Sequence, residues 1–313
     1  MKIGFVVDPL QTLHKTKDTS MLLMQHACER NFEVYCFDSC DLYHKGEVRA
    51  VAKRVKVNLS DDPQFEVQYS EDLAVKSFDV CFIRKDPPVD IHYVNMLQLL
   101  SIVEELPNSP FWVNSPSALL KANEKLYGLR FSHLFPPTCI SCSPRQIMEF
   151  QSQMKSSLVV KPVNEFSSRG IYILQERDPN TDAILDQMTS SGRDYVIAQK
   201  YLENVVLGDK RVFFVDGLVE GVISRIPREG DFRCALGLGA KVELRQLNSK
   251  EQALCDELIQ LFKRDGMFFV GIDIIDGCLI EVNVTSPTVV RQYCDLSGDA
   301  LDAKIYEKVL EKI

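Results

Sequence analysis

The chain has 313 residues, which is enough to bury a sizeable core in two or three domains. Its 36 basic residues against 44 acidic ones give a net charge of −8, and without a long basic run this excludes nucleic acid as the main partner. The apolar run in MKIGFVVDPL is too short for a signal peptide and no stretch of about 18 apolar residues occurs, so we expect a soluble cytoplasmic protein with no membrane partner.

The first third of the chain alternates strand and helix patterns. Compact apolar runs predict strands at 2–7, 32–37, 78–84 and 111–114, and helical patterns cover about 18–30 and 91–105. This order predicts an open α/β domain with a largely parallel sheet. The segment GEVRAVAKRVKVN, at 46–58, predicts an exposed hairpin or excursion between these elements.

The order of elements changes in the second part of the chain. Helices are predicted at 144–155 and 181–191, and strands at 157–163, 170–174 and 195–202. Two long strands follow around the turn Asp216-Gly217. Neighbouring strands without intervening helices predict an antiparallel α+β region. The long irregular segment at 227–243 has a length typical of a functional lid.

The segment GIDIIDGCLIEVNVTSPT, at 271–288, predicts a β-hairpin with one apolar and one polar face. A two-residue loop, Asp276-Gly277, would put the two apolar rows on opposite faces, so we predict a three-residue loop at 275–277 that pairs Asp273 with Leu279. The polar face then gathers Asp273, Glu281 and Asn283. These oxygen ligands suit Mg²⁺, although a solvated outer face is the simpler alternative.

Basic residues stand at the ends of several predicted strands. Lys161 ends an apolar run before a proline, Arg211 and Arg225 border the two long strands, and Arg233 lies in the irregular segment. Each alone fits a surface charge, but together with the acidic hairpin they predict a site where cations and Mg²⁺ share a polyphosphate. Because neither GxxxxGK[ST] nor GxGxxG after the first strand occurs, a Walker loop and a dinucleotide fold are both excluded.

Short segments along nearly the whole chain follow one order and spacing: VVDP (6–9), KDTS (17–20), DLY (41–43), RKDPP (84–88), NEKL (123–126), VVKP (159–162), GDKRV (208–212), RIP (225–227), FVGIDII (269–275) and EVNVTSPT (281–288). In this they resemble the prokaryotic glutathione synthetase family of the ATP-grasp superfamily. The resemblance implies an ATP-grasp fold with an N-terminal open α/β domain (1–122), a central lid domain (123–203) and a C-terminal domain with the metal site (204–313). It also implies that nucleotide is held between two antiparallel sheets and that the protein is a homotetramer.

The resemblance further implies a role for each matching residue. The nucleotide is expected at Lys125, Lys161, Asp209 and the hinge Gln199, Lys200, Tyr201 and Leu202. The catalytic arginines at the phosphate and acyl-phosphate region are Arg211, Arg225 and Arg233, and the ligands of Mg²⁺ or Mn²⁺ are Asp273, Glu281 and Asn283. The substrate pocket is expected at Asp18, Ser20, Arg225, Ser286 and Thr288, with Asp8 as a further wall. For Asp18 and Ser20 a helix cap is an equal alternative.

Two loops depart from the family pattern. A glycine-rich D-G-x-G-G loop is replaced at 164–170 by NEFSSRG, which removes residues that permit positive φ and close approach to phosphate. In the irregular segment, R-G-N-L-A-A-G-G becomes RCALGLGA at 233–240, so that Cys234 and Ala235 replace a glycine and an asparagine. These changes bear on rate and acceptor specificity more than on nucleotide binding.

The resemblance implies an ATP-dependent ligase that joins γ-glutamylcysteine and glycine through an acyl phosphate, giving glutathione, ADP and phosphate. Such phosphoryl transfer needs positioning and charge neutralisation rather than a protein nucleophile. Two alternatives stay open: a related carboxylate–amine ligase with another acceptor or peptide, and a nucleotide-binding protein with little turnover.

Overall fold

The computed structural model describes residues 1–13, 18–165 and 168–313. Its N-terminal part forms a seven-stranded mixed sheet in the order β3-β4-β2-β1-β6-β7, with β5 beside β4. The parallel strands are β1 (Lys2–Val6), β2 (Glu33–Phe37), β6 (Val80–Ile83) and β7 (Phe111–Val113). The antiparallel strands are β3 (Leu42–His44), β4 (Val48–Val57) and β5 (Phe65–Ala74).

The segment at 46–58, predicted as an exposed hairpin or excursion, does pair antiparallel with its neighbours in the sequence, β3 and β5, but the predicted exposure was wrong. Strand β4 lies inside the sheet, with Ala50 and Ala52 buried on one face and Val55 and Val57 buried on the other. Ordinary alternation along the strand explains this, because Ala50 and Ala52 stand at even positions and Val55 and Val57 at odd ones. The register shift opposite Arg54 and Val55 places its extra residue, Gln68, in β5. The sheet is consequently mixed, since β4 adds an antiparallel region to the predicted parallel strands.

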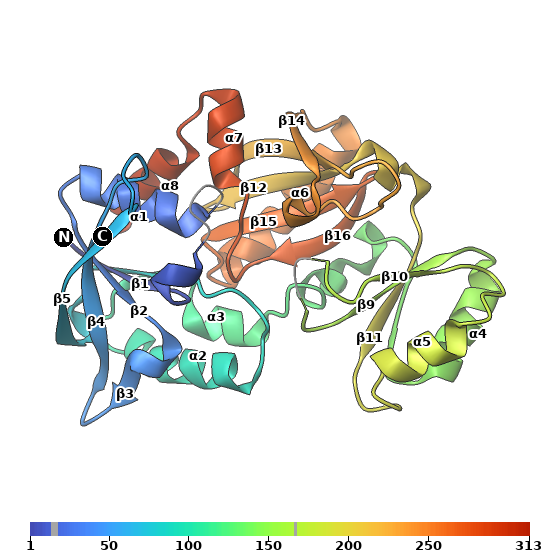
Figure 1. The fold of residues 1–313 in the computed structure, drawn as a ribbon, viewed down its shortest axis with the longest axis horizontal. Helices are drawn as coiled ribbons and strands as arrows, with labels where there is room; N and C mark the ends of the chain where they lie inside the picture. Colours follow the sequence, from blue (N-terminus) through green and yellow to red (C-terminus); the bar gives the residue numbers. More distant parts are fainter. Residues whose placement is uncertain (14–17, 166–167) are drawn as a thin grey trace.

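Helices cover both faces of this sheet (Figure 1). On one face α1 (Thr19–Glu29) packs beside α8 (Leu301–Leu310), and on the other lie α2 (Ile91–Glu104) and α3 (Pro116–Lys121). The hydroxyl of Tyr306 donates to the carbonyl of Leu23 at 2.9 Å, so the C-terminal helix closes onto the first one. The remaining C-terminal helix is α7 (Val290–Ser297).

The middle of the chain forms a small antiparallel sheet, visible in green and yellow in Figure 1. Its order is β10 (Tyr172–Leu174), β9 (Leu158–Pro162), β11 (Val196–Lys200) and β8 (Thr138–Ser141). The helices α4 (Pro144–Met154) and α5 (Thr181–Met188) bury one face of it against a core that includes Ile147, Val160 and Leu185. Helix α5 ends at Met188, three residues before the predicted end at 191.

The C-terminal sheet is also antiparallel and lies between the other two in Figure 1. Its order is β14 (Lys241–Leu244), β13 (Leu218–Ile226), β12 (Asp209–Val215), β15 (Phe269–Ile275) and β16 (Cys278–Asn283), with α6 (Ser249–Arg264) packed on one face. Short 3-10 helices connect the elements: η1 (Leu10–Thr12), η2 (Ser39–Asp41), η3 (Val75–Ser77), η4 (Tyr127–Leu134), η5 (Glu203–Leu207) and η6 (Leu236–Leu238).

The predicted three-residue loop of the acidic hairpin was wrong, although its two polar rows do share a face. The turn is the two-residue Asp276-Gly277, with φ of 54° and 68°, and Asp273 pairs with Glu281 rather than with Leu279. A bulge next to Asp273 makes Ile280 the extra residue, which restores the common faces. Leu279 therefore enters the core, and Ile280 points to the opposite side.

The N-terminal and C-terminal sheets share their cores, whereas the middle sheet has its own. Asn114, directly after β7, strengthens this junction: its amide group donates to the carbonyls of Phe269 (2.8 Å) and Val284 (2.7 Å), and its carbonyl accepts from the Phe269 amide (2.7 Å). The domain boundaries at 122 and 203 stay a prediction. Among the described residues, no helix is both long and apolar enough to span a lipid bilayer.

Candidate active site

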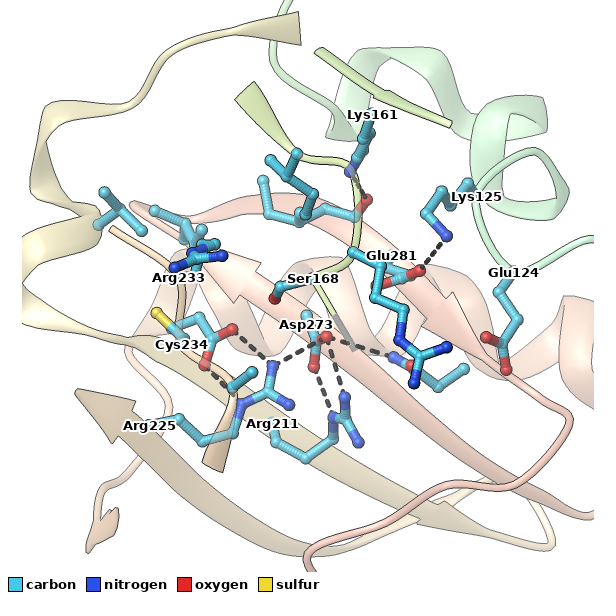
Figure 2. A pocket seen from close by; sticks show the side chains of 18 of the residues that line it. Glu124, Lys125, Lys161, Ser168, Arg211, Arg225, Arg233, Cys234, Asp273 and Glu281 are labelled. Atoms are coloured by element: carbon cyan, nitrogen blue, oxygen red, sulfur yellow. Dashed lines mark hydrogen bonds and ion pairs between the residues drawn. The ribbon is translucent and has the colours of Figure 1, made fainter. Parts of the chain in front are cut away.

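A cavity of about 620 Å³ lies where the three parts of the chain meet, and Figure 2 shows its interior. Residues from the start of α1 and the segment after β6, from both antiparallel sheets and from the segment after β13 form its walls. The long irregular segment borders it through Phe232 and residues 233–238. The cavity is therefore bounded on several sides by elements that are distant in the sequence.

The structure brings nearly all the predicted site residues to this one cavity. Those that line it are Asp18, Lys125, Lys161, Gln199, Lys200, Tyr201, Leu202, Asp209, Arg211, Arg225, Arg233, Asp273, Glu281, Asn283, Ser286 and Thr288. Ser20 and Asp8 are the exceptions, and Ser20 is buried with its hydroxyl accepting from Nε of Arg84 at 3.2 Å. Shared lining places these residues together but leaves the individual role of each a prediction.

Asp273 is the most heavily paired side chain of the site. Its Oδ1 lies 2.5 Å from Nε of Arg211, and its Oδ2 lies 3.0 Å from Nη2 of Arg211 and 2.9 Å from Nη2 of Arg225. Figure 2 shows both guanidinium groups beside this carboxylate. Burial alone would raise the pKa of Asp273, but the two arginines hold that pKa below its ordinary value, so the group is ionised.

The other two predicted metal ligands lie on the same face of the hairpin. Glu281, directly opposite Asp273, has its Oε1 3.2 Å from Nζ of Lys125, and Asn283 donates from its amide nitrogen to Asp273 at 3.3 Å. Two carboxylates and an amide oxygen on paired strands are a donor set that Mg²⁺ or Mn²⁺ accepts. The residues thus fit a divalent cation in chemistry, provided that their present partners move.

Asp209 forms a buried ion pair with Arg225. The two residues lie directly opposite each other on β12 and β13, and Nε of Arg225 donates to Oδ1 of Asp209 at 2.8 Å. Burial raises the pKa of Asp209, and the guanidinium opposes this shift. Arg225 consequently bridges Asp209 and Asp273, which ties Asp209 into the charged floor of the cavity.

Lys161 presents a buried ammonium group with few partners. Its side chain is 5 % exposed, and its Nζ donates to the carbonyl of Ile280 at 3.4 Å. Burial lowers the pKa of Lys161 to about 8, an effect that nearby Lys125 reinforces and Glu281 opposes. An anionic ligand would supply the partner that this group lacks.

Lys125 and the loop after β9 meet at the same end of the cavity. Its ammonium group donates to the backbone carbonyl of Glu165, and Glu165, Ser168 and Arg169 also line the cavity. The predicted departure from a glycine-rich loop covers 164–170. Phe166 and Ser167 of this loop lie outside the described residues.

Two of the predicted walls of the substrate pocket have structural partners. Asp18 caps α1, accepting from the amides of Ser20 (2.7 Å) and Met21 (3.3 Å), and it also lines the cavity. Asp8 pairs with Lys85 and does not itself line the cavity. Asp18 is therefore both the N-cap of α1 and a residue of the cavity wall.

Sequence reasoning missed Glu124 and Asp86, which line the cavity. Oε1 of Glu124 accepts from the amides of Val284 and Thr285 at 3.0 Å each and from the Thr285 hydroxyl at 2.7 Å, which fixes the chain directly after β16. Asp86 accepts a hydrogen bond from the Ser286 side chain. Both residues belong to segments that carried the resemblance, NEKL and RKDPP. Membership of these segments was the sequence feature that could have identified them.

Comparisons with known proteins cover the full length of the chain. Residues 1–119 match the model of the prokaryotic glutathione synthetase N-terminal domain, and residues 124–298 match that of the prokaryotic glutathione synthetase ATP-grasp domain. The chain is 38 % identical over 314 residues to the glutathione synthetase of Prochlorococcus marinus subsp. pastoris, with 100 % of each chain covered.

Solved structures share the fold at lower identity. D-cycloserine synthetase DcsG superposes with a TM-score of 0.69 at 15 % identity, covering 100 % of this chain and 99 % of that one. The ATP-grasp ligase PsnB complexed with its minimal precursor has a TM-score of 0.63 at 19 % identity, with 98 % of each chain covered. These likenesses confirm the predicted ATP-grasp fold. The two domain models and the relative that is 38 % identical show that the chain belongs to the prokaryotic glutathione synthetase family, whose members are ATP-grasp ligases.

Proposed function

We propose that the chain transfers the γ-phosphoryl group of ATP to the cysteinyl carboxylate of γ-glutamylcysteine and then couples the acyl phosphate to glycine. The amine of glycine attacks the acyl carbon, the bond to phosphate breaks, and the amine loses a proton to give the amide of glutathione. The single observation that carries this proposal is one cavity that combines a hinge segment, buried cations and paired carboxylates in a chain of this family.

The nucleotide is held between the middle and C-terminal sheets. Residues 199–202 form the end of β11 and the two positions after it, and they offer backbone groups to adenine, while the side chains of Val159 and Ile280 provide apolar contact from opposite sheets. The ammonium groups of Lys125 and Lys161 lie deeper and bind phosphate oxygens, because both are buried and neither has a full complement of partners.

A divalent cation, Mg²⁺ or Mn²⁺, would be held by Asp273, Glu281 and Asn283. When bound, it would neutralise phosphate charge and orient the γ-phosphoryl group. For these residues to serve as ligands, Arg211, Arg225 and Lys125 turn from the carboxylates to the phosphate oxygens that arrive with the nucleotide. The arrangement supports such an exchange because each cation already lies within about 3 Å of a ligand oxygen.

Arg211, Arg225 and Arg233 stabilise the charge that develops on the transferred phosphoryl group. Arg233 comes from the segment after β13, where Asp231 pairs with it at 2.9 Å, and it is more exposed than the other two. Closure of this segment over the substrates would bring Arg233 to the acyl phosphate and exclude water, which would otherwise hydrolyse that intermediate.

A different acyl acceptor is the second candidate, favoured by one observation. Cys234 and Ala235, which replace the glycine and asparagine of the family pattern, both line the cavity. Phosphate release from ATP, measured with γ-glutamylcysteine and each of several amino acids, tests both candidates. Glycine as the preferred acceptor supports the main proposal, another amino acid supports the second, and no peptide-dependent release contradicts both.

The family resemblance also suggests a homotetramer in the cytoplasm, and light scattering of the purified protein tests the oligomeric state. A mass of about four times 35.6 kDa supports this part of the proposal.

A further inference from the structure

Three charged side chains form a cluster directly behind one wall of the cavity. Nζ of Lys85 lies 2.6 Å from Oδ1 of Asp8 and 2.7 Å from Oδ1 of Asp38. These residues follow the parallel strands β6, β1 and β2, so the cluster lies at the carboxyl edge of the sheet. All three side chains are mostly buried, and none of them lines the cavity.

The cluster holds the backbone of a residue that does line the cavity. The amide of Asp86 donates to Oδ2 of Asp8 at 3.0 Å. Asp8 thus uses one carboxylate oxygen for Lys85 and the other for Asp86. Asp86 and Pro87, the next two residues after Lys85, both face the cavity.

The same segment is held from its other side by Arg84. Its Nε donates to the Ser20 hydroxyl at 3.2 Å, and its Nη2 donates to the carbonyl of Pro287 at 2.9 Å. Because Asp86 also contacts the Ser286 side chain, the N-terminal segment and the turn after β16 form one continuous wall. Its position is set by charged groups on both sides.

The ammonium group of Lys85 neutralises the two carboxylates, of Asp8 and Asp38, that converge on it. Without a cation, Asp8 and Asp38 would repel each other and Asp8 would turn away from the Asp86 amide. Burial would lower the pKa of Lys85, but Asp38 and Asp8 raise it above its ordinary value, so the side chain stays charged through the neutral range.

We propose that Lys85 is a positioning residue for the peptide-binding end of the cavity: by holding Asp8 against the Asp86 amide, it determines how Asp86 and Pro87 face the donor peptide. The inference rests on the proposed function for the identity of that peptide. It predicts an effect on the peptide and not on ATP, whose hinge and phosphate contacts come from other walls.

The test compares Lys85→Met and Lys85→Arg with the wild type by steady-state kinetics. In Lys85→Met the KM for γ-glutamylcysteine should rise at least about tenfold, since small displacements of a binding wall have effects of this size, while the KM for ATP changes less than about twofold. Lys85→Arg should recover most of the loss. The matched control, Lys304→Met, breaks an ion pair with Glu220 (3.3 Å) away from the cavity and should leave both KM values unchanged.

A second variant keeps the test valid if Lys85→Met does not fold. Asp8→Ala removes the acceptor for the Asp86 amide but leaves Lys85 paired with Asp38, and it should raise the peptide KM in the same selective way. An unchanged peptide KM, or a parallel rise in both KM values, overturns the inference while leaving the proposed function intact. A wild type without peptide-dependent phosphate release overturns the proposed function and the inference together.

Discussion

Arg211 contacts both carboxylate oxygens of Asp273, at 2.5 Å and 3.0 Å. It therefore uses the oxygens that we propose as metal ligands. Arg225 adds a third contact at 2.9 Å. In the absence of nucleotide these cations compete with a divalent ion for the same oxygens. The metal and the triphosphate should therefore bind as a coupled pair, because the phosphates give the guanidinium groups another partner.

Substitution of Arg211 by Met should tighten direct binding of Mn²⁺ to the nucleotide-free protein by at least about tenfold. Unit charges 4 Å apart interact by about 4 kcal/mol at an effective dielectric constant of 20, so even a part of this energy suffices. Electron paramagnetic resonance of Mn²⁺ titrations measures the affinity. Adding Asp273→Asn to this variant should cancel the gain, and an unchanged affinity in Arg211→Met would contradict the competition.

Glu281→Gln should abolish turnover while the fold is retained. It removes one charged ligand from the hairpin but preserves the shape of the side chain, and we expect at least about a hundredfold loss, as is typical when one contact to a developing charge is lost. The phosphate-release assay at limiting Mg²⁺ gives the rate, and thermal unfolding gives the stability. Activity like that of the wild type would remove Glu281 from the metal site.

Nucleotide affinity should fall as the pH rises through the pKa of Lys161, which is about 8. Between pH 7.5 and 9 the loss of this proton should weaken binding of a non-hydrolysable ATP analogue by about eightfold, since binding requires the ammonium form. Calorimetric titration measures the dissociation constant. Lys161→Arg stays charged and should show no such fall; an equal fall in that variant would assign the pH dependence to another group.

The lowered pKa of Lys161 also predicts how the free energy of unfolding depends on pH. The folded pKa is depressed below that of an unfolded lysine, so between about pH 8 and 10.5 the unfolded chain binds more protons. The contribution of Lys161 to the free energy of unfolding should therefore increase with pH in this window. Denaturant unfolding of the wild type and Lys161→Met at pH 7.5 and 10 checks the sign.

Glu124→Ala should lower the free energy of unfolding by roughly 2–4 kcal/mol, because it leaves the buried amides of Val284 and Thr285 without their acceptor. Glu124→Gln keeps an acceptor oxygen and should cost at most about 1 kcal/mol. Urea unfolding gives both values. Glu149→Ala, which removes an exposed carboxylate from a helical ion pair, is the control and should be near neutral. Equal losses for the two Glu124 variants would contradict this anchoring role.

The alternation of apolar and polar residues predicted side-chain faces correctly where a single hairpin determines them. The alternation in 271–288 indicated a hairpin with Asp273, Glu281 and Asn283 on one face, and the structure has that face. It failed on the loop length because a bulge beside Asp273 restores the alignment that a longer turn was expected to provide. The expected exposure of 46–58 was wrong because β4 lies inside the sheet and buries side chains on both faces, Ala50 and Ala52 on one and Val55 and Val57 on the other.

By itself, the sequence determined the alternating strands and helices of the first third, the faces of the acidic hairpin and the family, since each of these depends on short segments and their spacing. Tertiary structure alone decided the partners of the charges: that Asp209 faces Arg225, that Arg211 reaches Asp273 at a sequence separation of 62, and that Asp8 pairs with Lys85 instead of lining the cavity. Side-chain periodicity records which way a residue points, whereas a buried ion pair depends on the register and packing of strands far apart in the chain.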